Sequence, residues 1–128
     1  MNLPMRCLSC LVTALVGLPL AAQEPLELPS GRVVVLQEIL WDSEGAISRF
    51  RFVAPWAATV DAGGVLDDMT ALCHGFALPV QQALYPDAGE VVISFASEPG
   101  EFGVMNAEIV QFFEGFTTEG ADCIWNGH

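Results

Sequence analysis

Acidic side chains are the residues of this sequence with the clearest capacity for chemistry. Asp67 and Asp68 are adjacent, while Asp42 and Glu44 belong to the run DSEG at residues 42–45, which is similar to the first half of a calcium-binding loop. Paired carboxylates can perform acid–base catalysis or bind a hard divalent cation. Neighbouring helix residues point about 100° apart, however, and the later acidic ligands of a calcium loop are missing. The competing interpretation is a polar hairpin tip and the charged start of a helix.

Possible nucleophiles form the second group of candidates. His74 follows Cys73, but neighbours on a helix do not face each other, and a nucleophilic cysteine needs a free thiolate beside its base. Ser43, Ser94 and Ser97 all lack the G-x-S-x-G surroundings of a nucleophile elbow. The sequence therefore predicts no catalytic residue and no cofactor. It favours a non-enzymatic protein over a small hydrolase whose site is assembled from scattered residues.

Two arginines form a candidate binding pair. Arg49 and Arg51 alternate with apolar residues in the run RFRFVA at residues 49–54, which places both guanidinium groups on one face of a half-buried strand. On an exposed sheet they would attract an anionic group or a protein partner. The alternative is that cross-strand carboxylates, such as Glu38 or Glu114, neutralise them.

The three tryptophans are candidates for contact with a partner, because this residue is enriched at binding hot spots. Trp41 and Trp125 lie at the ends of predicted strands, where we expect them to cap the core. Trp56 follows Pro55 at the start of a predicted loop. We therefore select Trp56, together with Arg49 and Arg51, as the predicted partner-binding residues.

The first residues have the pattern of a secretory signal peptide. A short segment with one positive charge, residues 1–6, precedes an almost wholly apolar run at residues 7–20, and small residues end at Ala22. A membrane anchor would need about 20 apolar residues, and the position of Cys10 does not suit lipid attachment. We expect cleavage after residue 22, a periplasmic or secreted product, and no stable membrane insertion afterwards.

Cysteines and charge then describe the exported product. Removal of residues 1–22 leaves Cys73 and Cys123, an even pair that predicts one disulfide in an oxidising compartment; two buried thiols are the alternative. All 16 acidic residues follow Ala22, against three arginines and no lysine, so the product carries a net charge of −13. Such a surface repels phosphate backbones, which excludes nucleic acid and leaves a protein or envelope component as the expected partner.

Hydrophobic periodicity predicts one α+β domain over residues 32–128, after an extended lead-in at residues 23–31. An apolar stripe with helical spacing, from Val65 through Met69 to Phe76, predicts a helix over residues 61–76, with Gly75 or Pro79 as its stop signal and a short helical turn at residues 79–84. The predicted strands cover residues 32–41, 49–54, 90–96, 107–117 and 122–125. The order ββαβββ favours an antiparallel sheet with one main helix packed on one face.

Several short segments also carry a family resemblance. They are LQEILW at residues 36–41, RFRFVAP at 49–55, VVIS at 91–94, EFGV at 101–104, QFFE at 111–114 and CIW at 123–125. Together they resemble an uncharacterised family of small exported alphaproteobacterial proteins, the domain of unknown function numbered 6497. The resemblance implies a periplasmic location and supplies no activity, ligand or catalytic residue. The best interpretation is a non-enzymatic periplasmic domain that binds a protein or envelope component. One alternative is a weak binder of a divalent cation or small ligand that uses Asp42, Glu44, Asp67 or Asp68. The other alternative is a small hydrolase.

Overall fold

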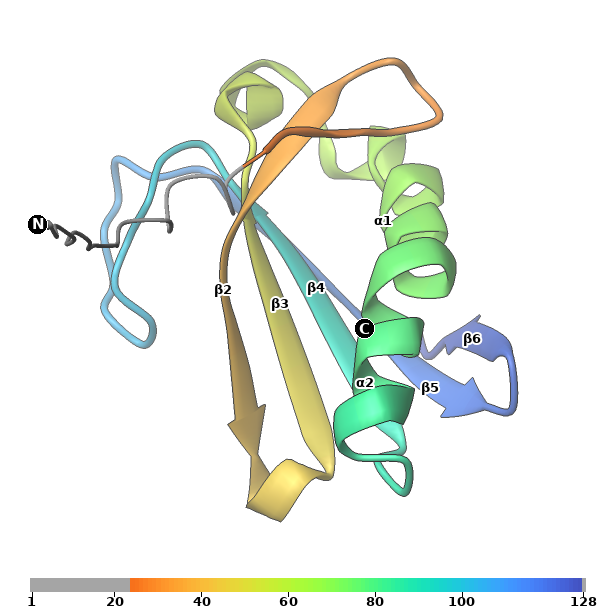
Figure 1. The fold of residues 1–128 in the computed structure, drawn as a ribbon. Coiled ribbons are helices and arrows are strands. Elements are labelled where there is room, and N and C mark those ends of the chain that lie inside the picture. The colour runs from red at the N-terminus through yellow and green to blue at the C-terminus, as the bar shows by residue number, and fades with distance from the viewer. Residues whose placement is uncertain (1–23, 128) are drawn as a thin grey trace, which may run out of the picture.

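A computed structural model describes residues 24–127 of the chain. They form a curled sheet of six strands, and one long helical segment lies across one face of it (Figure 1). This arrangement confirms the predicted α+β class. The predicted signal peptide at residues 1–22 lies outside the described residues. None of the helices within residues 24–127 is both long and apolar enough to cross a membrane.

The strands follow one another across the sheet in chain order. They are β1 (Leu26–Glu27), β2 (Val33–Asp42), β3 (Ile47–Val53), β4 (Glu90–Ala96), β5 (Gln111–Glu119) and β6 (Asp122–Trp125). The bounds of β4 and β6 agree with the prediction, and those of β2 and β3 differ by one or two residues. The prediction did not include β1, which forms from the Pro-rich lead-in, and it began the fourth predicted strand too early, at residue 107.

The predicted all-antiparallel sheet is wrong at one strand pair. β3 and β4 are parallel, with Phe50 opposite Ile93, while the other neighbouring pairs are antiparallel. The reason is the connection between them. The helical segment carries the chain back along the sheet, so that β4 starts at the same end as β3.

The helical segment begins later than predicted, and the short helical turn expected at residues 79–84 is part of it. α1 (Leu66–Leu72), a π-helical turn at Cys73–Ala77, and α2 (Leu78–Leu84) follow one another without a break. Two 3₁₀ turns, Pro55–Thr59 and Ala62–Gly64, precede α1. The second contains the paired glycines Gly63 and Gly64, which disfavour a regular helix. Pro79 does not end the segment, because it stands in the first turn of α2, directly after a π turn whose wider ring leaves room for it.

The core lies between the helical segment and one face of the sheet. The predicted stripe is confirmed, because Val65, Met69 and Cys73 are all at most 1% exposed. Opposite them, the sheet contributes Phe50, Phe52, Ile93, Phe95 and Phe116, each also at most 1% exposed. Burying a side chain of this size contributes about 1.5–3 kcal/mol, so this layer supplies most of the apolar stabilisation of the domain.

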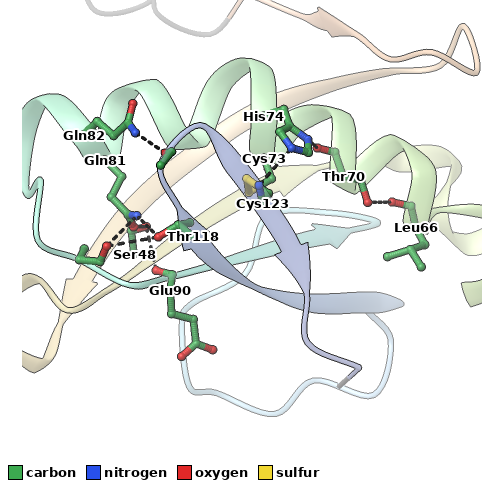
Figure 2. The surroundings of a disulfide bond; sticks show 12 residues. Ser48, Leu66, Thr70, Cys73, His74, Gln81, Gln82, Glu90, Thr118 and Cys123 are labelled. Atoms are coloured by element: carbon green, nitrogen blue, oxygen red, sulfur yellow. Dashed lines mark hydrogen bonds between the residues drawn. A yellow bond between two sulfur atoms is a disulfide. The ribbon is translucent and has the colours of Figure 1, made fainter.

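A buried polar cluster joins α2 to the sheet (Figure 2). Gln81 is 1% exposed, and its Oε1 accepts a hydrogen bond of 2.6 Å from the hydroxyl of Ser48 on β3. Its Nε2 donates to Thr118 Oγ1 on β5 at 3.2 Å. A buried polar group without partners destabilises a fold, so these bonds favour one placement of α2 over the sheet.

Candidate binding surface

The predicted disulfide is present. Cys73, in the π turn, is bonded to Cys123 in β6, with the two Cα atoms 6.2 Å apart (Figure 2). Cys73 and Cys123 are 0% and 7% exposed. The bond links the helical segment to the last strand, and it removes Cys73 as a nucleophile.

Both ring nitrogens of His74, an exposed residue, have hydrogen-bond partners within the chain. Its Nε2 lies 3.0 Å from the backbone nitrogen of Cys123, and its Nδ1 lies 3.2 Å from the carbonyl oxygen of Thr70 (Figure 2). A backbone N–H can only donate, so Nε2 is the acceptor, and Nδ1 carries the proton and donates to Thr70. A general base needs a nitrogen that can reach substrate, and neither nitrogen of His74 is free in this arrangement.

The acidic candidates are dispersed by the fold. Asp42 forms an ion pair with Arg49 at 2.9 Å. Asp68 is 2% exposed and accepts hydrogen bonds from the backbone nitrogen and hydroxyl of Ser30, at 3.1 and 2.6 Å. Glu44 and Asp67 are exposed. Among residues 24–127, no three His, Cys, Asp or Glu side chains come together as metal ligands would.

Trp56 is placed differently from the expectation of an exposed anchor. Its Nε1 donates a hydrogen bond of 2.8 Å to the carbonyl oxygen of Val33, and its ring packs edge-on against Phe95. The guanidinium carbon of Arg32 lies over the ring, 4.8 Å from its centroid. Because the indole is half-buried and fully engaged, its role as a partner-binding residue stays a prediction with little surface to support it.

The other two tryptophans divide between core and surface. Trp41 packs against Phe50 and Tyr85, with ring centroids 6.2 and 4.7 Å apart, which confirms that it caps the core. Trp125 is 49% exposed, and its Nε1 donates to Glu114 Oε1 at 2.6 Å. The expectation that Trp125 caps the core is therefore wrong, because β6 is a short strand at the edge of the sheet.

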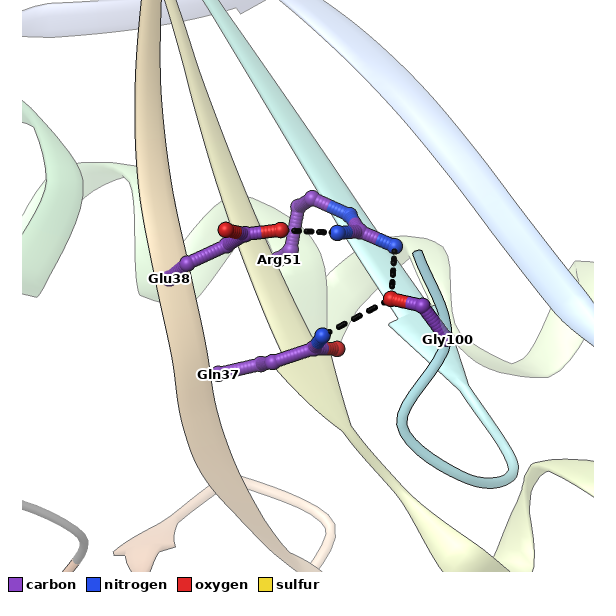
Figure 3. Close-up of polar contacts among 4 residues, drawn as sticks. All are labelled: Gln37, Glu38, Arg51 and Gly100. Atoms are coloured by element: carbon purple, nitrogen blue, oxygen red, sulfur yellow. Dashed lines mark hydrogen bonds and ion pairs between the residues drawn. The ribbon is translucent and has the colours of Figure 1, made fainter. Parts of the chain in front are cut away.

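The arginine pair is neutralised within the fold. Arg51 is paired with Glu38, as one interpretation predicted, and its Nη2 also donates to the carbonyl oxygen of Gly100 at 3.0 Å (Figure 3). Only 7% of the Arg51 side chain is exposed, against 30% for Arg49. The second suggested partner, Glu114, bonds to Trp125 instead. Arg51 thus has little surface to offer a partner directly.

The loop between β4 and β5, residues 97–110, covers these arginines. It folds across the sheet on the side away from the helical segment (Figure 1). Gly100 is its anchor, because the carbonyl oxygen accepts hydrogen bonds from Arg51 and from Gln37 Nε2, the latter at 2.8 Å (Figure 3). The ring of Phe102 then lies 5.6 and 5.5 Å from the guanidinium carbons of Arg49 and Arg51, within the range of a cation–π contact.

An exposed apolar patch results on this side of the sheet. Phe102, Val104 and Met105 from the loop are 51%, 59% and 96% exposed, and Phe113 from β5 is 56% exposed. These four side chains, which we call the Phe102–Phe113 patch, line one pocket of about 280 Å³ together with Arg51, Glu101, Gly103 and Gln111. The pocket therefore has two aromatic rings, a flexible methionine and the carboxylate-bearing Glu101 among its lining residues.

This patch was not among the residues predicted to bind a partner, although the sequence contains one signal of it. In QFFE, two consecutive phenylalanines occupy one strand, and consecutive strand residues point to opposite faces. Phe112 packs against the core, so Phe113 points away from it. One of the two rings had to face the side of the sheet that carries Arg49 and Arg51.

Taken together, the fold and this surface define a small disulfide-bonded α+β domain with a preformed apolar patch. Comparison with known proteins agrees with the resemblance carried by the sequence. The model of a family of unknown function (DUF6497) matches residues 12–128, and the chain belongs to this family. No curated protein and no solved structure matches the chain significantly.

Proposed function

We propose that the chain is the precursor of an exported, non-enzymatic domain that binds a protein through the Phe102–Phe113 patch, in the periplasm or outside the cell. The signal-peptide pattern of residues 1–22 supports export. The Cys73–Cys123 disulfide supports it independently, because such bonds persist in oxidising compartments. Binding, and not catalysis, agrees with the engagement of His74 and Cys73 inside the fold.

The observation that carries the proposal is the exposure of the patch. Four neighbouring apolar side chains, two of them aromatic, are each more than half exposed around one pocket. Contiguous apolar surface of this kind marks interaction sites in soluble proteins. Phenylalanine and methionine are also enriched in the centres of protein–protein interfaces. A function in binding gives this surface a reason to exist that folding alone does not.

The patch is also held in place before a partner arrives. The loop that supplies three of its four side chains is fixed at Gly100 by Gln37 and Arg51, and Arg51 is fixed in turn by Glu38. A preformed surface loses less conformational entropy on binding. Arg51 therefore acts as a positioning residue in this proposal.

The proposal is tested by quantitative capture. The mature protein and its Phe113→Ser variant are each used to capture cross-linked proteins from the cell envelope of the source organism. Leu84→Ser is the matched control, because Leu84 is 59% exposed at the end of α2. We expect a specific protein to be captured by the wild type and by Leu84→Ser, and lost with Phe113→Ser. Equal capture by all three would refute the patch as the binding surface.

A further inference from the structure

We propose that the partner of the Phe102–Phe113 patch is a basic protein segment. It inserts one apolar side chain between Phe102 and Phe113 and places Lys or Arg side chains beside Glu98 and Glu101. This inference rests on the proposed function and specifies the chemistry of the partner. It follows from the charge of the domain, from the position of two carboxylates, and from the size of the pocket.

The charge of the domain is strongly one-sided. Residues 24–127 contain all 16 acidic residues of the chain and three arginines. Both sheet arginines already form ion pairs, Arg49 with Asp42 and Arg51 with Glu38, and Arg32 lies over the Trp56 ring. Little positive charge remains for an anionic partner, whereas a cationic partner is attracted by the whole domain.

Two exposed carboxylates lie beside the patch, where they could contact basic side chains of the bound segment. Glu98 and Glu101 are exposed and line a small pocket that shares Arg51, Val104 and Gln111 with the pocket of the patch. Glu101 lines both pockets. The ion pairs formed among residues 24–127 involve neither of these glutamates. Both carboxylates thus border the apolar patch and are open to a cationic side chain.

The size of the pocket favours an amino-acid side chain as the inserted group. Its volume is about 280 Å³, at the lower end of the roughly 300–1,000 Å³ of sites that enclose a small molecule. Its walls are the rings of Phe102 and Phe113 and the side chains of Val104 and Met105. An aliphatic or aromatic side chain fills such a space, while the surrounding carboxylates select for basic neighbours in the sequence of the partner.

The same charges argue against the other occupants of an apolar patch. A second copy of the domain would bring Glu98 and Glu101 of both copies to one interface, between two bodies with an excess of 13 negative charges each over residues 24–127. Like charges juxtaposed at an interface cost several kcal/mol. An anionic lipid surface is repelled for the same reason. The occupant that these charges favour is therefore a basic segment of another protein.

A random peptide library displayed on phage provides the probe. It is selected on the immobilised mature protein, and one enriched peptide is then synthesised for titration. We expect enriched sequences with Lys or Arg on both sides of Leu, Phe or Trp, and an affinity that falls as salt increases. Phe113→Ser should weaken the binding of this peptide at least about tenfold, as for a hot-spot residue. The double variant Glu98→Gln/Glu101→Gln should weaken it severalfold and reduce the salt dependence, and Leu84→Ser should leave it unchanged.

The outcomes separate this inference from the proposed function. Enriched peptides that are neutral or acidic, but still require Phe113, would overturn the basic partner and leave the patch as a binding surface. Peptides whose affinity is unchanged by Phe113→Ser and by Phe102→Ser, or no enrichment at all, would overturn both. A concentration-dependent dimer in sedimentation that Phe113→Ser abolishes would identify a second copy as the occupant and refute the basic segment.

Discussion

Breaking the Cys73–Cys123 bond is expected to remove a large part of the stability of the domain. The two residues are 50 positions apart in the sequence. A cross-link that closes a loop of this length lowers the entropy of the unfolded chain by about 14 cal/mol/K, which corresponds to about 4 kcal/mol at 25 °C. Domains of this kind have a total stability of about 5–15 kcal/mol. The reduced protein should therefore be close to its threshold of folding.

Urea unfolding measures this loss directly. The oxidised wild type is compared with the reduced wild type and with the double variant Cys73→Ala/Cys123→Ala, each monitored by tryptophan fluorescence. We expect a free energy of unfolding about 4 kcal/mol lower for the reduced protein. The double variant should lose somewhat more, because removing buried sulfur atoms also leaves a small cavity. The slope against urea should rise, because an uncrosslinked chain exposes more surface on unfolding.

A loss below about 1 kcal/mol in the reduced protein would refute this reasoning. It would mean that the unfolded chain is already compact around these residues. It would also mean that the packing of the helical segment on the sheet, and not the bond to β6, holds the last strand in place.

Three further predictions concern polar groups. Gln81→Leu should cost about 1–3 kcal/mol of unfolding free energy in a urea titration, because it leaves buried partners unpaired. Gln82→Leu should cost no more than about 1 kcal/mol, because the one hydrogen bond that it removes, from Nε2 to the carbonyl oxygen of Gly120, lies at the exposed surface. Equal costs would contradict the buried cluster. Arg51→Met should lower the free energy of unfolding by about 1–3 kcal/mol. It should also speed amide hydrogen exchange in residues 97–110, because the hydrogen bond from Arg51 to the carbonyl oxygen of Gly100 is lost. Unchanged exchange would contradict a role of Arg51 in fixing this loop. His74→Ala should lower the free energy of unfolding by about 1 kcal/mol. In the wild type, ¹⁵N NMR should show the ring proton of His74 on Nδ1. A proton on Nε2 would contradict the assigned hydrogen bonds.

Much of the architecture could be predicted because it depends on local patterns. The apolar stripe from Val65 to Phe76 has the spacing of one helix face, and alternation in RFRFVA separates Phe50 and Phe52 from the arginines. Both patterns predict which side chains face the core, and both are confirmed. The loop at residues 97–110 nevertheless covers the arginine side of β3 as well, so Arg51 is only 6% exposed. The pairing of Cys73 with Cys123 followed from arithmetic alone, once the cysteines at residues 7 and 10 were assigned to the signal peptide.

The errors arose where tertiary contacts override local preference. Pro79 normally interrupts a helix, but a π turn before it allows the helical segment to continue. The Pro-rich lead-in has no periodicity, yet β1 pairs with β2 and Ser30 bonds to the buried carboxylate of Asp68. The local sequence predicts neither the pairing of β1 with β2 nor the hydrogen bonds between Ser30 and Asp68.

The candidate surface was the least predictable part for a related reason. Trp56 follows a proline in a predicted loop, and only the distant carbonyl of Val33 and ring of Phe95 explain why it is half-buried. The proposed binding face exists only because residues 97–110 fold across the sheet and are held there at Gly100. Phe102 lies in a loop and Phe113 in a strand, and the fold, not their spacing, brings them to one pocket.

The central claim is that a partner contacts the Phe102–Phe113 patch in the cell, and a photo-reactive amino acid can test it most directly. The protein is expressed in its source organism with the photo-reactive residue at position 113 or, as a control, at position 84, and the cells are irradiated. The account predicts one discrete protein adduct from position 113 that disappears when Phe102→Ser is added, and none from position 84. The same adducts from both positions, or no adduct from position 113, would contradict it.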